Sequence, residues 1–345
     1  MSSCKGSFGL TALLVIGVLS ACSGGEMAEE KSMTPAENPF LTDWDGPFGA
    51  PPFDRIVPAH YIPAYEQGMA DHGAEIEAIV SNSEPPSFAN TIEAYERSGE
   101  LLNRVSTYVN NQNGAHTNEA TQDVVKEMAP RLSAHFTDIA LNAALFEKVA
   151  AVWEQRDGLE LDAEQAMLLK NTYNEFVRNG AQLEGEARER MRAINEELST
   201  LGVQFSDNLL AEMNAPALVI ENESDLQGLP GDVVASAAGV ASSNGLDGKW
   251  AFTLQRTSWT PFLTYSERRD LREKLYTAYT NLGSNGNEYD NTEIASRIAA
   301  LRVQRAQLLG YDTHADYVLE ERMAETPDRV LDLLERVWSC LLYTS

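Results

Sequence analysis

Basic residues are scarce in this sequence. Its 345 residues hold 26 Lys and Arg against 52 Asp and Glu, which gives a formal net charge of −26. A chain this acidic is repelled by phosphate backbones, and no segment gathers enough Lys and Arg to form a local basic patch. The sequence therefore excludes nucleic acid as a partner.

Self-contained catalytic motifs are also missing. The sequence holds no G-x-S-x-G turn, no P-loop and no G-x-G-x-x-G. None of its five histidines lies four residues from another, so no H-E-x-x-H helix can present two imidazoles to one metal ion. Scattered histidines are more often core or surface residues than ligands, and we interpret all five in that way: His60, His72, His116, His135 and His314. We therefore predict no catalytic residue and no metal ligand within this chain.

An apolar run near the N-terminus is typical of a secretory signal. Lys5 precedes the run at residues 8–19, which is too short to span a bilayer because a spanning helix needs about 20 apolar residues. The run ends in Leu-Ser-Ala-Cys, which resembles a bacterial lipobox. We expect residues 1–21 to be a lipoprotein signal peptide and Cys22 to become the lipidated N-terminus. The alternative is an ordinary secretory signal followed by a chance cysteine.

The lipobox interpretation also sets the location and redox state of the chain. Ser23, rather than Asp, follows Cys22, which resembles the default for outer-membrane sorting. We expect a lipoprotein of the cell envelope that is anchored in the outer membrane and faces the periplasm. Cys4 would be cleaved off and Cys22 would carry lipid, so the mature chain would retain one thiol, that of Cys340, which excludes an internal disulfide. Residues 22–38 are rich in Gly, Ser and Glu without apolar periodicity, and they predict a flexible acidic tether.

Helical patterns dominate residues 39–338, which we expect to form one helical region. A Pro-, Gly- and aromatic-rich segment, 39–60, opens it and is expected to lie extended on the folded surface. Capping-box spacings predict helix starts at Asn90 and at Asp162. An N-cap, proline and acidic residue in order predict another start after Thr326.

The clearest apolar stripe runs from Met191 to Phe205, where apolar residues alternate by three and four. We expect this helix to pack on the helix of residues 162–183 as a long antiparallel pair. Such a pair would bury Leu198 and Leu201 and leave Glu197 on the outer face.

The period changes near Ala217. Residues 217–221 and 249–255 predict two short strands that pair around a helix at 230–242. The predicted fold class is therefore mostly α, with long antiparallel helices and a small β insertion. Residues 339–345 follow an apolar stripe without a helix C-cap, and we expect them to be a foreign tail after a truncated reading frame.

Three segments resemble the thimet-oligopeptidase-like zinc peptidases, the family of oligopeptidase A, neurolysin and bacterial peptidyl-dipeptidase. The first is PPSFANTIEAYERSG at 85–99, and the second is FVRNGAQLEGEARERMRAINEELSTLGVQFSDNLL at 176–210. The third and strongest covers 266–338, from SERRDLREKLYTAYTNLGSNGNEYDN to RMAETPDRVLDLLERVW. The bacterial peptidyl-dipeptidase branch is the most similar.

This resemblance implies the helical N-terminal half of a channel-type zinc metallopeptidase that hydrolyses short peptides, with release of dipeptides as the expected mode. In that family an H-E-x-x-H helix and a downstream Glu hold the zinc, and the motif Glu acts as general base. This sequence has no counterpart of those residues, so we expect the chain alone to be inactive. The alternative is a non-catalytic helical lipoprotein that binds peptides or partner proteins.

The lipobox generates a first prediction. Replacement of Cys22 by Ser removes the sulfur that would carry lipid, so the Cys22→Ser protein should move from the membrane fraction to the soluble fraction. Cys4→Ser is the matched control, since that residue would leave with the signal peptide. Equal distribution of wild type and Cys22→Ser would contradict the lipobox interpretation.

Overall fold

The computed structural model describes residues 38–344, so the expected signal peptide, Cys22 and nearly all of the tether lie outside the described residues. The helices are α1 Tyr61–Ser81, α2 Ala94–Glu96, α3 Glu100–Ala115, α4 Glu119–Ala140, α5 Ala143–Glu154, α6 Ala163–Arg178, α7 Gly185–Asn214, α8 Gly231–Ser243, α9 Arg256–Tyr265, α10 Arg269–Thr280, α11 Thr292–Leu308, α12 His314–Leu319 and α13 Pro327–Thr344. The strands are β1 Pro216–Ile220 and β2 Trp250–Thr253. No described helix combines the length and apolarity needed to cross a bilayer.

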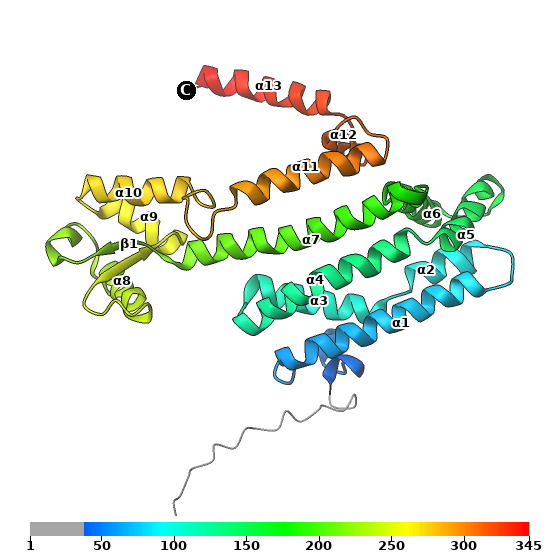
Figure 1. Cartoon of the computed structure of the whole chain (residues 1–345), viewed down its shortest axis with the longest axis horizontal. Helices are drawn as coiled ribbons and strands as arrows, with labels where there is room; N and C mark the ends of the chain where they lie inside the picture. Colours follow the sequence, from blue (N-terminus) through cyan, green and yellow to red (C-terminus); the bar gives the residue numbers. More distant parts are fainter. Residues whose placement is uncertain (1–37, 345) are drawn as a thin grey trace, which may run out of the picture.

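Long helices stacked side by side form the body of the molecule (Figure 1). The stack rises from α1 through α3 and α4 to α7 and α11, and the small β unit lies at one end while α5 and α6 lie at the other. Neighbours run antiparallel: Arg190 and Glu197 of α7 contact Gln304 and Arg297 of α11, in reversed order. The mostly-α fold class with long antiparallel helices is confirmed.

The predicted partner of α7 is wrong. This helix packs against α4 and α11, whereas α6 packs against α5. The α4–α7 seam is polar: Ser133 donates to the Asn195 carbonyl, Asn195 donates to Thr137, and Ser199 donates to the Ala129 carbonyl. Hydrogen bonds thus join the two helices along this seam, and the middle of the predicted apolar stripe is only partly buried.

Two residues of that stripe show the consequence. Leu198 and Leu201 are only partly buried, whereas Ile194 and Met191, one and two turns before Leu198, are fully buried. Glu197 does not lie on a free outer face, because its carboxylate accepts two hydrogen bonds from Arg297, at 2.5 and 2.8 Å. Both parts of the prediction were therefore wrong: Leu198 is not fully buried, and Glu197 is not free.

The segment before α1 is only partly as predicted. It forms short 3₁₀ turns at Pro39–Leu41, Pro47–Gly49 and Pro58–His60 instead of a fully extended chain. Phe40 is buried against Tyr61 and Tyr108, and Arg104 donates to the Phe40 carbonyl at 2.8 Å. One aromatic side chain therefore anchors this segment, and its proline residues fix the turns around it.

Helix starts follow the capping rule with one shift of register. The predicted box at Asp162 is confirmed, since its side chain accepts from the Gln165 amide and the Gln165 side chain accepts from the Asp162 amide. The capping box predicted to begin at Asn90 begins at Ser87 instead. Ser87 is the N-cap residue, and Asn90 is the third residue of the helix that follows it. The helix that follows is π-helical over Phe88–Glu93 and breaks before α3.

The β insertion is confirmed. Strands β1 and β2 pair antiparallel, with Ile220 opposite Trp250, and α8 lies between them in the sequence. Buried Phe252, Phe262 and Leu275 pack the strands against α9 and α10. This unit has its own small core, separate from the two clusters within the helical stack.

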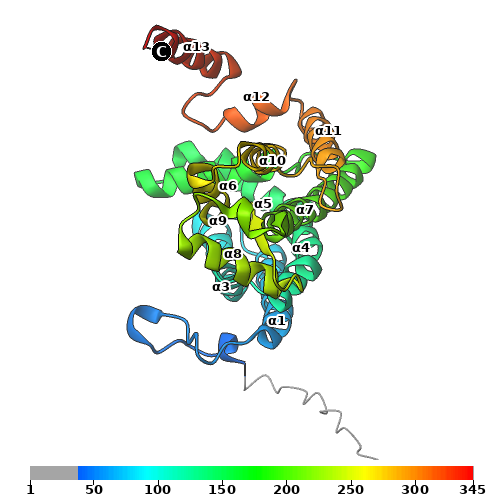
Figure 2. The same ribbon diagram turned by 90° about the vertical axis from the view of Figure 1, so that its left-hand side faces the viewer.

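The last described helix stands apart from the stack in both views (Figure 2). It begins at Pro327, where the sequence predicts a start, and the Thr326 hydroxyl accepts from the Arg329 amide. Leu334 and Trp338 are exposed on its apolar face. The helix continues to Thr344, across most of the segment expected to be a foreign tail.

The burial of an apolar residue in α7, rather than its place in the apolar stripe, should decide how much stability its truncation costs. Ile194 is 0% exposed, so Ile194→Ala should lower the free energy of unfolding by about 2–5 kcal/mol, as buried Ile truncations do. Leu201→Ala, on the same helix but partly exposed, should cost less than half as much. Urea denaturation of both variants tests this, and equal midpoints would place Leu201 in the core after all.

Candidate functional site: a polar hollow around Arg178

Two adjoining hollows open beside the last turns of α6. The larger, of about 880 Å³, lies between α6 and the segment that contains α12. The smaller, of about 460 Å³, lies among α4, α6 and α7. Both are lined by Glu175 and Asn179, so these two residues stand on the ridge where the hollows meet.

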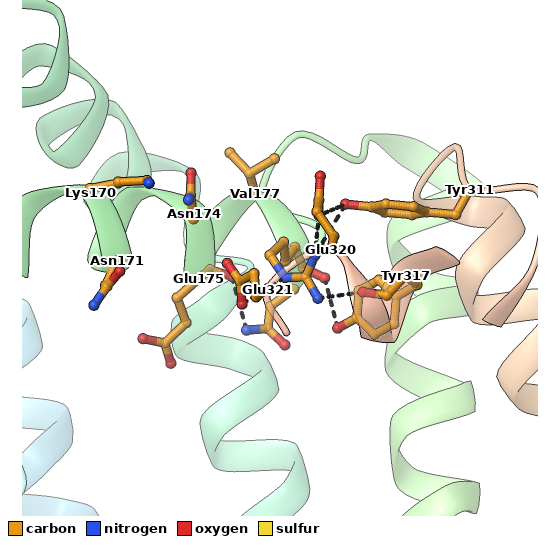
Figure 3. Close-up of a pocket in the computed structure, with 11 residues that line it drawn as sticks. Lys170, Asn171, Asn174, Glu175, Val177, Tyr311, Tyr317, Glu320 and Glu321 are labelled. Carbon is orange, nitrogen blue, oxygen red and sulfur yellow. Dashed lines mark hydrogen bonds and ion pairs between the residues drawn. The ribbon is translucent and has the colours of Figure 1, made fainter. Parts of the chain in front are cut away.

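Arg178 is the hub of the larger hollow, and most of the other residues that line the hollow are labelled in Figure 3. Its guanidinium donates to the Tyr317 carbonyl at 2.7 Å and to the Tyr311 hydroxyl at 3.3 Å. It also pairs with the carboxylates of Glu320 and Glu321 and lies 4.5 Å from the centre of the Tyr317 ring. The side chain is 12% exposed. These contacts fix α12 and the residues around it to the end of α6.

The sequence of α6 explains why its hollow-facing side is polar. Asn171, Asn174, Glu175 and Arg178 recur at the three- and four-residue spacing of one helix face. Buried residues of the opposite face, such as Phe176, pack toward α5. The apolar face therefore holds the helix in place while the polar face lines the hollow.

Electrostatics make the ridge between the hollows distinctive. Desolvation, together with the nearby carboxylates of Glu96 and Glu321, raises the pKa of Glu175. Burial, with Glu320 as a hydrogen-bonded neighbour, raises the pKa of Tyr311 to about 12, so its hydroxyl stays protonated and donates to Glu320. In Figure 3 the carboxyl group of Glu175 points away from the labelled Tyr311, Tyr317 and Glu320.

The chemistry of the hollow's lining suits the binding of polar chains. Asparagine side chains offer both donors and acceptors, and the carboxylates add acceptors, which suits a polypeptide main chain. Within residues 38–344, no group of three or more His, Cys, Asp and Glu is placed to hold a metal ion. We predicted no catalytic residue and no metal ligand, and the hollow is built from residues that the sequence analysis did not single out.

The histidines are arranged differently from the prediction. His72 of α1 and His135 of α4 meet, with His135 Nε2 3.1 Å from His72 Nδ1. Their separation of 63 residues gave no sequence signal for this pairing. The interpretation of the histidines as core or surface residues did not foresee this contact.

Comparison with known proteins identifies the lineage of this chain. Residues 262–341 match the sequence profile of Peptidase family M3. The chain is 37% identical over 300 residues to the dipeptidyl carboxypeptidase of Escherichia coli, an alignment that covers 87% of this chain and 44% of that protein. It is 31% identical over 304 residues to oligopeptidase A of Salmonella typhimurium, which covers 86% of this chain and 44% of that protein.

A plant protein shows the same pattern: the organellar oligopeptidase A of Arabidopsis thaliana is 28% identical over 312 residues, covering 89% of this chain and 39% of that protein. The chain thus spans less than half the length of these relatives. The predicted family resemblance is confirmed, and the chain is related to the M3 peptidases over most of its length.

The hub generates a third prediction. Arg178→Gln removes the charge that pairs with two carboxylates and the strongest donor to the Tyr317 carbonyl. Since hydrogen bonds to charged groups contribute about 1.5–3 kcal/mol, amides of α12 should exchange with solvent about tenfold faster or more.

Lys170→Gln is the matched control, because Lys170 lines the same hollow two turns earlier on α6. Hydrogen exchange followed by mass spectrometry measures both variants. An unchanged exchange rate in the Arg178→Gln protein would show that other contacts hold α12.

Proposed function

We propose that this chain, as a relative of the M3 peptidases, forms the helical, peptide-admitting part of a zinc metallopeptidase that hydrolyses short peptides and releases dipeptides. The observation that carries the proposal is the construction of the larger hollow. One wall is the polar face of α6, and the other comes from Tyr311, Tyr317 and Glu320, which lie inside the segment that matches the family profile.

The hollow suits a short, unfolded peptide as its occupant. Its volume of about 880 Å³ lies in the range of about 300–1,000 Å³ that small-ligand sites occupy. The amides of Asn171, Asn174 and Asn179 can replace the water that hydrates a free main chain. A folded protein has already paired its main-chain groups internally, so it gains little from such a lining.

The family relationship implies zinc, but the described residues do not fit that metal, because they contain no set of ligands for it. In the proposed enzyme the zinc and its general base therefore belong to a part of the protein other than residues 38–344. For this chain by itself we infer peptide binding without hydrolysis.

The proposed location is the periplasmic face of the outer membrane. The apolar run at 8–19 and the lipobox that ends at Cys22 support this location. Membrane contact would be made through lipid on Cys22 alone, and the acidic tether would hold the peptide-binding body away from the bilayer.

Peptide binding is the test of this function. A fluorescent, unstructured short peptide should bind the chain, as measured by anisotropy, and product analysis with added zinc should find the peptide intact. Asn174→Leu removes a donor and acceptor from the hollow and should weaken binding by up to about tenfold, the equivalent of one hydrogen bond.

Asn110→Leu is the matched control, since Asn110 is an exposed residue of α3 outside the hollow. Binding that Asn174→Leu leaves unchanged would contradict the assignment of the site. The same assay on the intact gene product separates the two functions considered from the sequence: metal-dependent cleavage supports the peptidase, and binding without cleavage supports a peptide-binding lipoprotein.

A further inference from the structure

The side chains around His72 form a chain of contacts that joins three elements. The His72 ring, 7% exposed, lies on α1 beneath the turn between α2 and α3. Its Nε2 lies 3.3 Å from the Ser98 hydroxyl, and its Nδ1 lies 3.1 Å from Nε2 of His135 on α4. Both ring nitrogens of a buried imidazole therefore have a partner.

The turn above the ring is shaped to receive it. Gly99 has a φ of 73°, and a Cβ added there would lie 3.0 Å from His72 Nδ1. The Gly99 amide donates to Glu75 Oε2 at 2.7 Å, which ties the turn to α1 one helical turn beyond His72. Glycine is required here both by its backbone conformation and by the closeness of the ring.

The direction of each hydrogen bond follows from a single proton count. The Ser98 hydroxyl donates its only proton to the Tyr95 carbonyl at 2.6 Å, so toward His72 it can only accept. His72 Nε2 therefore carries a proton, and in the neutral ring Nδ1 is left as an acceptor. His135 Nε2–H must donate to it. The pair tolerates one added proton, because an imidazolium N–H can still donate to a neutral imidazole nitrogen, but a second proton leaves no acceptor between the two rings.

We propose that His72 and His135 form a pH-sensitive clasp that holds α4 against α1 and the α2–α3 turn at neutral pH and opens in mild acid. When both rings are protonated, His72 Nδ1–H and His135 Nε2–H face each other across 3.1 Å, which replaces a hydrogen bond by repulsion. No pairing elsewhere offsets this within the described residues that face the ring.

The surrounding charges support that conclusion. Burial and the neighbouring His135 lower the pKa of His72. The carboxylate of Glu75 on α1 acts in the opposite direction, but its effect is smaller, so the pKa of His72 remains below its ordinary value. Burial also lowers the pKa of His135. The α2–α3 turn presents only Ser98 and the Gly99 amide.

The charged groups one turn before and one turn after His135 on α4 are already engaged. Arg131 pairs with Glu66 of α1, and Asp138 pairs with Arg192 of α7. Arg131 is a cation and cannot neutralise an additional proton on the histidines, and Asp138 could do so only by losing its own partner.

Phe136 connects the clasp to the smaller hollow, which adjoins the proposed peptide-binding hollow at Glu175 and Asn179. Its ring centre lies 6.1 Å from that of His72 and 5.5 Å from that of His135, and its side chain lines the smaller hollow. Opening of the clasp should therefore also alter the hollow, a consequence that rests on the proposed function. The clasp itself does not depend on peptide binding.

The stability of the folded chain as a function of pH tests the proposal. Both histidines have folded-state pKa values below the ordinary value of 6.5, so the unfolded chain takes up protons first as pH falls. The stabilisation is complete above that value and is lost below it. The urea concentration at the unfolding midpoint of wild type should therefore decrease as the pH is lowered from about 7 to about 5, the range in which histidine titrates.

His135→Gln should flatten that pH dependence, and His116→Gln, at an exposed histidine of α3's C-cap, should retain it. Parallel curves for wild type and His135→Gln would overturn the proposal. Nitrogen NMR of wild type gives a second measurement that needs no variant to fold: His72 should be the Nε2–H tautomer at neutral pH. An Nδ1–H tautomer there would also overturn it.

Discussion

The structure depends on the polar seam along α7. This helix has 30 residues, and a helix of that length spans about 45 Å, so it runs the length of the stack from the β unit to the neighbourhood of α6 (Figure 1). On one side it is held to α4 by the hydrogen bonds of Ser133, Asn195 and Ser199. On the other it is held to α11 by the pairing of Glu197 with Arg297. Directional bonds at fixed positions set the register of the stack more strictly than an apolar stripe, which tolerates sliding.

The end of α7 is fixed by the same kind of interaction. Glu212 is 4% exposed, and its carboxylate accepts from the Gly283 amide at 2.6 Å and from the side chains of Asn285 and Asn287. A buried carboxylate is stable only when its acceptor sites are filled, and here one loop fills them. The loop between α10 and α11 is thereby attached to α7, so α11 is positioned at its start by Glu212 and along its length by Arg297.

Local signals in the sequence were sufficient for the elements and insufficient for their partners. The capping box at Asp162, the strands around α8 and the start at Pro327 follow from residues close in the sequence, and all are found. The packing partner of α7 cannot be predicted from such local signals. The helical pattern makes Leu198 look like a core residue, although polar neighbours of Leu198 make hydrogen bonds to α4. The hollow was missed for the same reason, since the polar face of α6 has the pattern of any solvated helix face.

The shortage of cations connects the fold to the site. With 26 basic residues against 52 acidic ones, each Arg placed at a joint between elements removes one of the few charges that could balance the carboxylates elsewhere. Arg178 illustrates this, because two carboxylates and a carbonyl share its guanidinium. Glu175, one turn away, is left beside Glu96 and Glu321, and its pKa rises as a result of desolvation and those neighbours. The ridge between the hollows is therefore acidic, because the guanidinium of Arg178 beside it is already paired with other groups.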